Sequence, residues 1–228
     1  MIDHVWFDLG YTLVRLNREK VMKNILHNFD FDIDISKLEI AYHLTDKYFM
    51  KNYPGVLARN IDEYYPWYIG LLTYNLGIKV NLHELYNNIV IHRKNEPLIW
   101  STFEDTHEVL SCLNENGIKV GLISNWDTTA RNILIENDIE KYFSYIFISS
   151  EVGYEKPDER IFSNALNEAC INPERALYVG DNYYDDYLGA SKIDMKCLIL
   201  NRFDTLGIEE LKIKPLKKLS DVLNYLEI

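Results

Sequence analysis

Val5-Trp6-Phe7-Asp8-Leu9-Gly10, close to the N-terminus, is the stretch that decides which fold to expect for this chain. Its apolar residues form a short run of the kind found in buried strands, and the run stops at an aspartate with a glycine two residues later. We therefore predict a buried strand that opens into a tight, functional loop. In open α/β sheets ligands bind beyond the carboxyl ends of the strands, so Asp8 stands where chemistry is expected.

Further runs of the same buried type appear only in the second half of the chain. They cover 119–123, 145–148, 176–179 and 196–200. Helical patterns separate them: 105–116 carries apolar residues on one face and stops at Gly117, and another helix is expected to start at Pro157. Strands that alternate with helices through short links predict an α/β core with a parallel, doubly wound, Rossmann-like sheet.

The long stretch between the first two strands breaks this alternation. Its residues form mainly helical patterns over 19–27, 36–51, 60–76 and 81–93, with Pro66 expected to kink or split the third helix. We therefore expect residues 16–93 to form a small, all-helical cap domain that packs over the core. The core domain would then consist of residues 1–15 and 94–228.

Composition limits the classes of function. The chain has 228 residues, is 47% hydrophobic and carries a formal charge of −11, which argues against nucleic-acid and anionic-membrane partners. Cys112, Cys170 and Cys197 form no CxxC pair, so they are interpreted as buried thiols in a reducing compartment. The first ten residues lack the basic region of a signal peptide, and no later run offers about 18 consecutive apolar residues. We therefore expect a cytoplasmic protein without a membrane span.

Polar residues that could take part in catalysis or binding follow four of the five predicted strands. Because the carboxyl ends of parallel strands meet at one edge of a sheet, we expect these side chains to lie close together. They are Asp8 after the first strand, Ser124 and Asn125 after the second, Lys156 in the loop after the third, and Asp181, Asp185 and Asp186 after the fourth.

In this order the segments resemble the motifs of the haloacid dehalogenase (HAD) superfamily. The segments are 7–13 (FDLGYTL), 122–125 (LISN), 155–158 (EKPD) and 179–190 (VGDNYYDDYLGA). One such motif is a weak signal, but four in the right order at strand ends are specific. The resemblance covers the whole chain, since a helical insertion between the first two motifs marks subfamily I with its C1-type cap, which includes dehalogenases and many small-molecule phosphatases.

The resemblance implies a hydrolase that forms a covalent intermediate on Asp8. Ser124 would donate its hydroxyl to a phosphoryl oxygen, and the backbone amides of Leu9 and Asn125 would add further donors. Lys156 would balance the negative charge of the nucleophile and of the transferring phosphoryl group. The substrate would be a small phosphorylated molecule.

The resemblance also implies a magnesium ion. Two anions must otherwise approach each other, and Mg²⁺ takes oxygen ligands, which here would be Asp8, Asp181 and the backbone carbonyl of Gly10. Asp186, with Asp185 ranked lower, would hold the motif lysine or a metal-bound water. Asp185 and Asp186 could instead cap the helix expected to begin there, because acidic residues favour helix N-termini.

Gly10 departs from the pattern of the family's phosphatases. Those enzymes usually carry a second aspartate at this position, which protonates the leaving alcohol and then activates water. Its loss would cost on the order of 10²–10⁴ in rate for a leaving group that needs a proton. Three hypotheses therefore remain. The favoured one is a phosphatase for substrates with good leaving groups, such as acyl or aryl phosphates, and the second is a binding or regulatory relative with weak catalysis. The third is a metal-independent 2-haloacid dehalogenase, because the dehalogenases of the family also lack this aspartate and also carry an asparagine at the position of Asn125. The substrate and the oligomeric state stay open.

Overall fold

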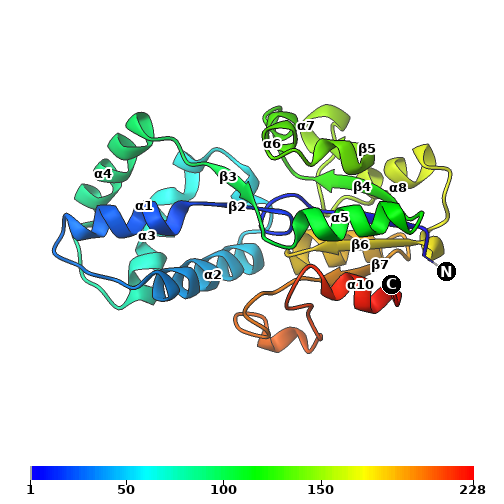
Figure 1. Ribbon diagram of the computed structural model, residues 1–228. Helices are drawn as coiled ribbons and strands as arrows, with labels where there is room; N and C mark the ends of the chain where they lie inside the picture. The colour runs from blue at the N-terminus through cyan, green and yellow to red at the C-terminus, as the bar shows by residue number, and fades with distance from the viewer. Residues whose placement is uncertain (1) are drawn as a thin grey trace. The chain divides into compact units, whose positions relative to one another are not determined.

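The computed structural model describes residues 2–228, which divide into two compact units. The first unit, here called the sheet unit, comprises residues 2–15, Ser101–Thr205 and Glu209–Ile228, and the second, the helical unit, comprises Leu16–Trp100 and Leu206–Ile208. Figure 1 draws both units, with the helical unit running from blue to green. The predicted cap, residues 16–93, lies within the helical unit, which also contains 94–100 and the short return segment 206–208.

A five-stranded parallel sheet forms the centre of the sheet unit, which confirms the predicted α/β fold class. The strand order β5-β4-β1-β6-β7 places β1 in the middle, where the chain's progression across the sheet reverses. Phe7 of β1 is in register with Leu122 of β4 and with Val179 of β6, so the three strands end at nearly the same level. The strands are β1 (His4–Phe7), β4 (Lys119–Ser124), β5 (Phe143–Ile148), β6 (Ala176–Gly180) and β7 (Lys196–Ile199).

Helices cover this sheet, and Figure 1 shows α5 and α10 in front of it. The α-helices of the sheet unit are α5 (Thr106–Glu115), α6 (Ala130–Glu136), α7 (Ser149–Val152), α8 (Glu159–Glu168), α9 (Leu188–Ser191) and α10 (Asp221–Leu226). The unit also contains the short 3-10 helices η2 (Glu140–Tyr142), η3 (Pro173–Arg175) and η5 (Glu209–Leu211) and the π-helix η4 (Tyr183–Tyr187). The helix expected to start at Pro157 begins at Glu159 instead, because the Asp158 side chain caps it by accepting a hydrogen bond from the Arg160 amide.

One hydrophobic cluster of the sheet unit lies between the sheet and α8. It includes the buried side chains of Trp6, Tyr178 and Phe162. Gly121 permits this packing, because a Cβ atom there would lie 2.2 Å from the Trp6 ring. The cysteines differ from the prediction: Cys170 is exposed in the turn after α8, while Cys112 and Cys197 are half-buried.

Four helices build the helical unit, and all four were predicted within two residues of their observed ends. They are α1 (Arg18–His27), α2 (Ile35–Asn52), α3 (Ile61–Leu76) and α4 (Leu82–Asn95), with the short turn η1 (Val56–Ala58). α3 continues through Pro66 and is not split there, although a split was one of the two outcomes predicted for this proline. The chain passes between the units through β2 (Val14–Leu16) and β3 (Trp100–Thr102), which form a small separate sheet.

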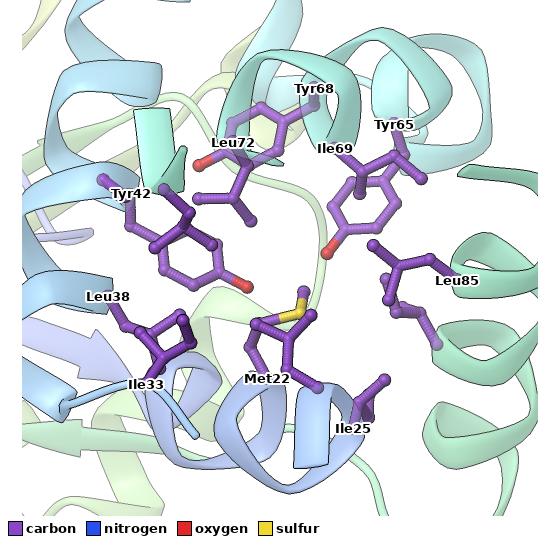
Figure 2. Packing of buried hydrophobic residues seen from close by; sticks show 14 of the residues in the cluster. Met22, Ile25, Ile33, Leu38, Tyr42, Tyr65, Tyr68, Ile69, Leu72 and Leu85 are labelled. Carbon is purple, nitrogen blue, oxygen red and sulfur yellow. The ribbon is translucent and has the colours of Figure 1, made fainter. Parts of the chain in front are cut away.

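The helical unit has its own apolar core, in which α1, α2, α3 and α4 turn large side chains toward one another. Figure 2 shows this cluster, with Met22, Ile25, Ile33, Leu38, Tyr42, Tyr65, Tyr68, Ile69, Leu72 and Leu85 labelled. A hydrophobic cluster of this kind is what allows a stretch of fewer than 100 residues to form a compact body.

The return segment 206–208 belongs to the helical unit because α2 holds it. The His43 Nε2 atom donates to the carbonyl oxygen of Leu206 at 2.9 Å, and Gly207 lies against the Lys47 side chain. Burial, reinforced by the positive charge of Lys47, lowers the pKa of His43 to about 4. His43 is therefore a neutral donor at physiological pH. No helix among residues 2–228 is long and apolar enough to cross a membrane.

Candidate active site

Asp8 lies directly after the central strand and is only 8% exposed. Its backbone N–H donates to the carbonyl of Val179 at 2.9 Å, which fixes it to the end of β6. The chain then turns sharply, because the amides of Leu13 and Val14 both donate to the Leu9 carbonyl. Tyr11, with φ of 55°, carries the left-handed conformation in this turn. The expected tight loop is thus present, with its unusual backbone angle one residue after Gly10.

Lys156 is the centre of the hydrogen-bond network around Asp8. Its Nζ atom donates to Asp8 Oδ1 at 2.8 Å, to Asp186 Oδ1 at 2.6 Å and to the Tyr178 hydroxyl at 2.9 Å. An ammonium group has three N–H bonds, so these acceptors use all of them. Burial lowers the pKa of Lys156, but the charges of Asp186 and Asp8 outweigh it and leave that pKa above its ordinary value. Lys156 is therefore a fixed cation, only 3% exposed.

The end of β4 positions both the nucleophile candidate and the lysine loop. Ser124, which is 1% exposed, donates its hydroxyl to Asp8 Oδ1 at 3.1 Å. Asn125 holds the backbone of Lys156 in two directions: its Nδ2 donates to the Lys156 carbonyl at 2.8 Å and its Oδ1 accepts from the Lys156 amide at 2.7 Å. The Asn125 side chain thus fixes the loop that presents the lysine, while its backbone amide is the group predicted to face a phosphoryl oxygen.

The turn after β6 supplies the carboxylates that face Lys156. Asp186 is fully buried, and Gly180 makes room for it, since a Cβ at Gly180 would lie 2.1 Å from Asp186 Oδ2. The side-chain oxygen of Asn182 caps the π-helix η4 by accepting from the backbone amides of Tyr184 and Asp185. The backbone amide of Asn182 donates to Asp186 Oδ2 at 2.9 Å. Capping is therefore done by Asn182, and Asp186 instead contacts Lys156 as its resemblance-based role requires.

Asp185 lies in an environment that disfavours its negative charge. It is 7% exposed, its Oδ2 accepts from the Asn182 side chain at 2.6 Å, and its buried Oδ1 has no hydrogen-bond partner. Burial raises the pKa of Asp185 to about 7, and the charges of Asp186, Asp8 and Asp181 add to this. Burial also raises the pKa of Asp8, against the lowering effect of Lys156. Both pKa shifts are led by burial, and at Asp185 the charge of Lys156 opposes that of the neighbouring carboxylates, so each of the two carboxylates would be stabilised by a further positive charge nearby.

These features fit a hard divalent cation. The donors are all oxygens, which Mg²⁺ prefers, and the raised pKa values of Asp8 and Asp185 together with the unpartnered Asp185 Oδ1 indicate room for additional positive charge. Within residues 2–228, no three His, Cys, Asp or Glu side chains are grouped so that they could hold a metal by themselves. A metal held by Asp8 and Asp181, which follows β6, would therefore need the Gly10 carbonyl as a further protein ligand, as the resemblance implies.

Comparison with known protein families adds independent evidence. The family model of haloacid dehalogenase-like hydrolases matches residues 25–200 of this sequence. The chain belongs to this family. The match extends through most of the helical unit and through the motif segments that follow β4, β5 and β6.

Similar curated proteins include haloacid dehalogenase-like hydrolase domain-containing proteins and a phosphatase. The haloacid dehalogenase-like hydrolase domain-containing protein 3 of Danio rerio is 30% identical over 176 residues, covering 74% of this chain and 72% of that protein. Its Mus musculus counterpart is 33% identical over 106 residues, covering 46% and 42%. The glyceraldehyde 3-phosphate phosphatase of Methanothermobacter thermautotrophicus is 37% identical over 100 residues, covering 43% and 44%. The chain thus spans less than half the length of the last two relatives.

Solved structures of similar fold come from enzymes of different chemistry. A HAD phosphatase from Thermococcus onnurineus superposes with a TM-score of 0.59 at 17% identity, covering 99% of this chain and 98% of that one. An L-2-haloacid dehalogenase superposes with a TM-score of 0.62 at 17% identity, covering 100% and 99%. At this identity the likeness shows the fold alone, so the chemistry must be argued from the residues of the site.

Three contributions to the site were missed by the sequence reasoning. The Tyr178 hydroxyl contacts Lys156, the Asn125 side chain fixes the lysine loop, and Asn182 caps η4. Asn182 could have been found, since asparagine just before a helical turn is a favoured cap. Tyr178 gives no such signal, because a tyrosine inside a buried strand is usually a packing residue.

Proposed function

We propose that this chain is a magnesium-dependent phosphohydrolase that acts on a small phosphorylated metabolite through an aspartyl-phosphate on Asp8. The observation that carries the proposal is the pair of donors on one carboxylate oxygen: Ser124 at 3.1 Å and Lys156 at 2.8 Å both reach Asp8 Oδ1. Such donors fix the orientation of a nucleophile before substrate arrives. The phosphatase among the similar proteins supports the same reaction class.

In the proposed reaction, a carboxylate oxygen of Asp8 attacks phosphorus and forms a new O–P bond while the bond from phosphorus to the leaving group breaks. Lys156 stays protonated and, with the Ser124 hydroxyl, stabilises the negative charge that spreads over the phosphoryl oxygens. Water then attacks phosphorus and the bond between Asp8 and phosphorus breaks, so that Asp8 is restored as the carboxylate and both protons of the water leave on inorganic phosphate. Mg²⁺ held by Asp8, Asp181 and the Gly10 carbonyl would supply charge neutralisation between the two anions.

The identity of residue 10 restricts the leaving group. Glycine offers no carboxyl to protonate a departing alkoxide, and so alkyl phosphate esters should react on the order of 10²–10⁴ more slowly than they would with a general acid in place. A leaving group that departs as a stable anion, such as a carboxylate or a phenolate, does not need that proton. We therefore propose acyl or aryl phosphates as the preferred class.

Two other functions keep specific support. Gly10 favours a binding or regulatory relative with weak catalysis, because such a protein can retain the charge network without the proton donor. Asn125 after Ser124, together with Gly10, favours a haloacid dehalogenase, in which a halide leaves without a proton. The carboxylate-rich edge with raised pKa values at Asp8 and Asp185 favours the metal-dependent reaction over the dehalogenase.

The test is steady-state hydrolysis of acetyl phosphate and p-nitrophenyl phosphate with and without Mg²⁺. Wild type should turn over both substrates only with the metal, Asp8→Asn should abolish turnover, and Asp34→Asn should retain it. Asp34 is a matched control, since it is exposed and its side chain makes no capping hydrogen bond.

Three results would contradict the proposal. If the Asp8→Asn variant still hydrolyses the substrates, Asp8 is not the nucleophile. Mg²⁺ binding without turnover of either substrate would favour the binding relative. Chloride release from a 2-chloro acid without metal would favour the dehalogenase.

A further inference from the structure

Tyr178 is a fully buried residue of β6 whose hydroxyl lies inside the charge network rather than in the apolar core. The hydroxyl oxygen accepts from Lys156 Nζ at 2.9 Å and donates its own proton to the carbonyl of Ile123 at 2.7 Å. Both roles of the hydroxyl are therefore used. Burial raises the pKa of Tyr178 well above its ordinary value, and the charges of Asp186 and Asp8 add to this, so the proton stays on the oxygen.

The position of Tyr178 in the sheet explains how one side chain reaches both partners. In the strand order β4-β1-β6, β1 lies between the tyrosine on β6 and Ile123 on β4. The hydrogen bond from Tyr178 to Ile123 thus crosses over the central strand, at the level where that strand ends in Asp8. The ring itself is held by an edge contact with Phe162, with centroids 5.3 Å apart. The hydroxyl is consequently a fixed point of the core.

We propose that Tyr178 is a positioning residue that acts together with Asp186 to aim the third N–H of Lys156 at the nucleophile. The proposal rests on the function proposed above, in which Lys156 stabilises the transferring phosphoryl group. An ammonium is tetrahedral, so two N–H bonds anchored to fixed acceptors determine where the third one points. Asp186 and Tyr178 are such anchors, because neither takes part in bond formation, whereas Asp8 becomes phosphorylated.

This arrangement matters most when the charge on Asp8 changes. When a phosphoryl group is added to Asp8, the carboxylate that attracts Lys156 becomes an acyl phosphate, and the negative charge then lies on the phosphoryl oxygens. With both anchors in place, Lys156 keeps its direction through this change. Without the Tyr178 hydroxyl, only Asp186 remains, and the ammonium can rotate about that single contact and leave one N–H without an acceptor.

The experiment compares wild type with Tyr178→Phe and with the control Tyr145→Phe. Tyr145 also packs against the Trp6 cluster, with the centroids of the two stacked rings 5.8 Å apart, but within residues 2–228 its hydroxyl has no hydrogen-bond partner. For Mg²⁺-dependent acetyl phosphate hydrolysis, Tyr178→Phe should lower kcat on the order of tenfold, as expected for one hydrogen bond to a charged group, and leave KM nearly unchanged. Tyr145→Phe should change neither.

A second readout does not depend on activity. In ¹⁵N-labelled wild type, the Nζ–H signal of Lys156 should be protected from exchange with water, because all three protons are hydrogen bonded. The signal is assigned by its loss in Lys156→Arg. It should be lost or exchange much faster in Tyr178→Phe and persist in Tyr145→Phe.

The two readouts separate this inference from the proposed function. Retention of both kcat and the protected signal in Tyr178→Phe would overturn the positioning role, and so would an equal loss of kcat in Tyr145→Phe. If wild type shows no turnover, the proposed function fails, and the Nζ–H signal then decides about Tyr178 alone: its loss in Tyr178→Phe supports the anchor, and its persistence overturns it.

Discussion

Replacing Lys156 by methionine removes the cation between two buried carboxylates while keeping a side chain of similar length. Lys156 is 3% exposed, and its partners Asp8 and Asp186 are 8% and 0% exposed. The carboxylates would remain without their shared donor, in a region where water cannot replace it. Breaking a buried ion pair by removing one partner typically costs about 3–5 kcal/mol, because a buried charge is left uncompensated.

That loss can be converted into a melting temperature. For proteins of about 150–250 residues, 1 kcal/mol corresponds to roughly 2–4 °C, so Lys156→Met should melt about 6–20 °C below wild type near neutral pH. Lys119→Met is the control, since Lys119 is exposed at the start of β4 in the same sheet unit. It should melt close to wild type.

The loss of stability in Lys156→Met should depend on pH. Lys156 lowers the pKa of Asp8, which burial raises, so its removal raises that pKa further. A carboxyl whose pKa is raised in the folded state stabilises the protein below the unfolded pKa, and this stability is lost as pH rises through the folded pKa. The deficit of Lys156→Met relative to wild type should therefore be larger at about pH 8 than at about pH 5. Thermal unfolding followed by circular dichroism at both pH values measures it, and a variant that melts within about 2 °C of wild type at the higher pH would refute the charge balance inferred for the site.

Three further predictions concern other parts of the chain. Gly10→Asp should raise hydrolysis of an alkyl phosphate such as glycerol phosphate by up to ~10²–10⁴, measured as phosphate release, and an unchanged rate would show that the missing carboxyl is not what limits the reaction. Gly180→Ala and Gly121→Ala each insert a Cβ at a close contact, 2.1 Å from Asp186 Oδ2 and 2.2 Å from a buried indole, respectively. In both variants the free energy of unfolding, measured with denaturant, should fall by about 1–3 kcal/mol, but only Gly180→Ala should also lower kcat. Equal kcat values in the two variants would contradict the role given to Asp186. Because the pKa of His43 is lowered to about 4, the stability it contributes is lost as pH falls from about 6.5 toward 4. His43→Gln should flatten that acid limb in urea unfolding, and an unchanged slope would assign the limb to other groups.

The sequence predicted the elements of the fold closely, because their signals are local. The strand at β1 was expected from three apolar residues before Asp8, and the helices of the helical unit from apolar spacing and from stops such as Gly77, which takes a left-handed conformation at the end of α3. Pro66 was expected to kink or split the third helix, and the split is wrong, because α3 is one continuous helix. Since Pro66 lies in the second turn of α3 and the helix packs against its neighbours on both sides of it, tertiary packing outweighed the cost of the proline.

The burial of the cysteines was only partly predictable. Cysteine is a residue type that is usually buried, yet Cys170 lies in the turn after α8 with φ of 53° and is exposed. Exposure at a turn depends on where the chain changes direction relative to the sheet. An intrinsic preference for burial does not contain that information.

Local sequence patterns were enough to predict which residues gather at the carboxyl edge of the sheet. A parallel sheet with short links brings the ends of its strands together, so the order of Asp8, Ser124, Lys156 and Asp186 along the chain was enough to predict their neighbourhood. Each of these residues follows a buried run, and such runs can be recognised in one dimension. The absence of a carboxyl side chain at Gly10 can likewise be seen in the sequence alone.

The hydrogen bonds among these side chains could not be predicted from the sequence and depend on the three-dimensional packing of the strands. Tyr178 reaches from β6 across β1 to β4, and Gly180 is needed because Asp186 folds back over it. Both contacts join residues whose distance depends on strand order, register and twist, and none of these quantities is encoded by a pattern within a single segment. Local patterns therefore place the charged groups at one edge, whereas the packing of three strands determines that Lys156 is held by three acceptors at once.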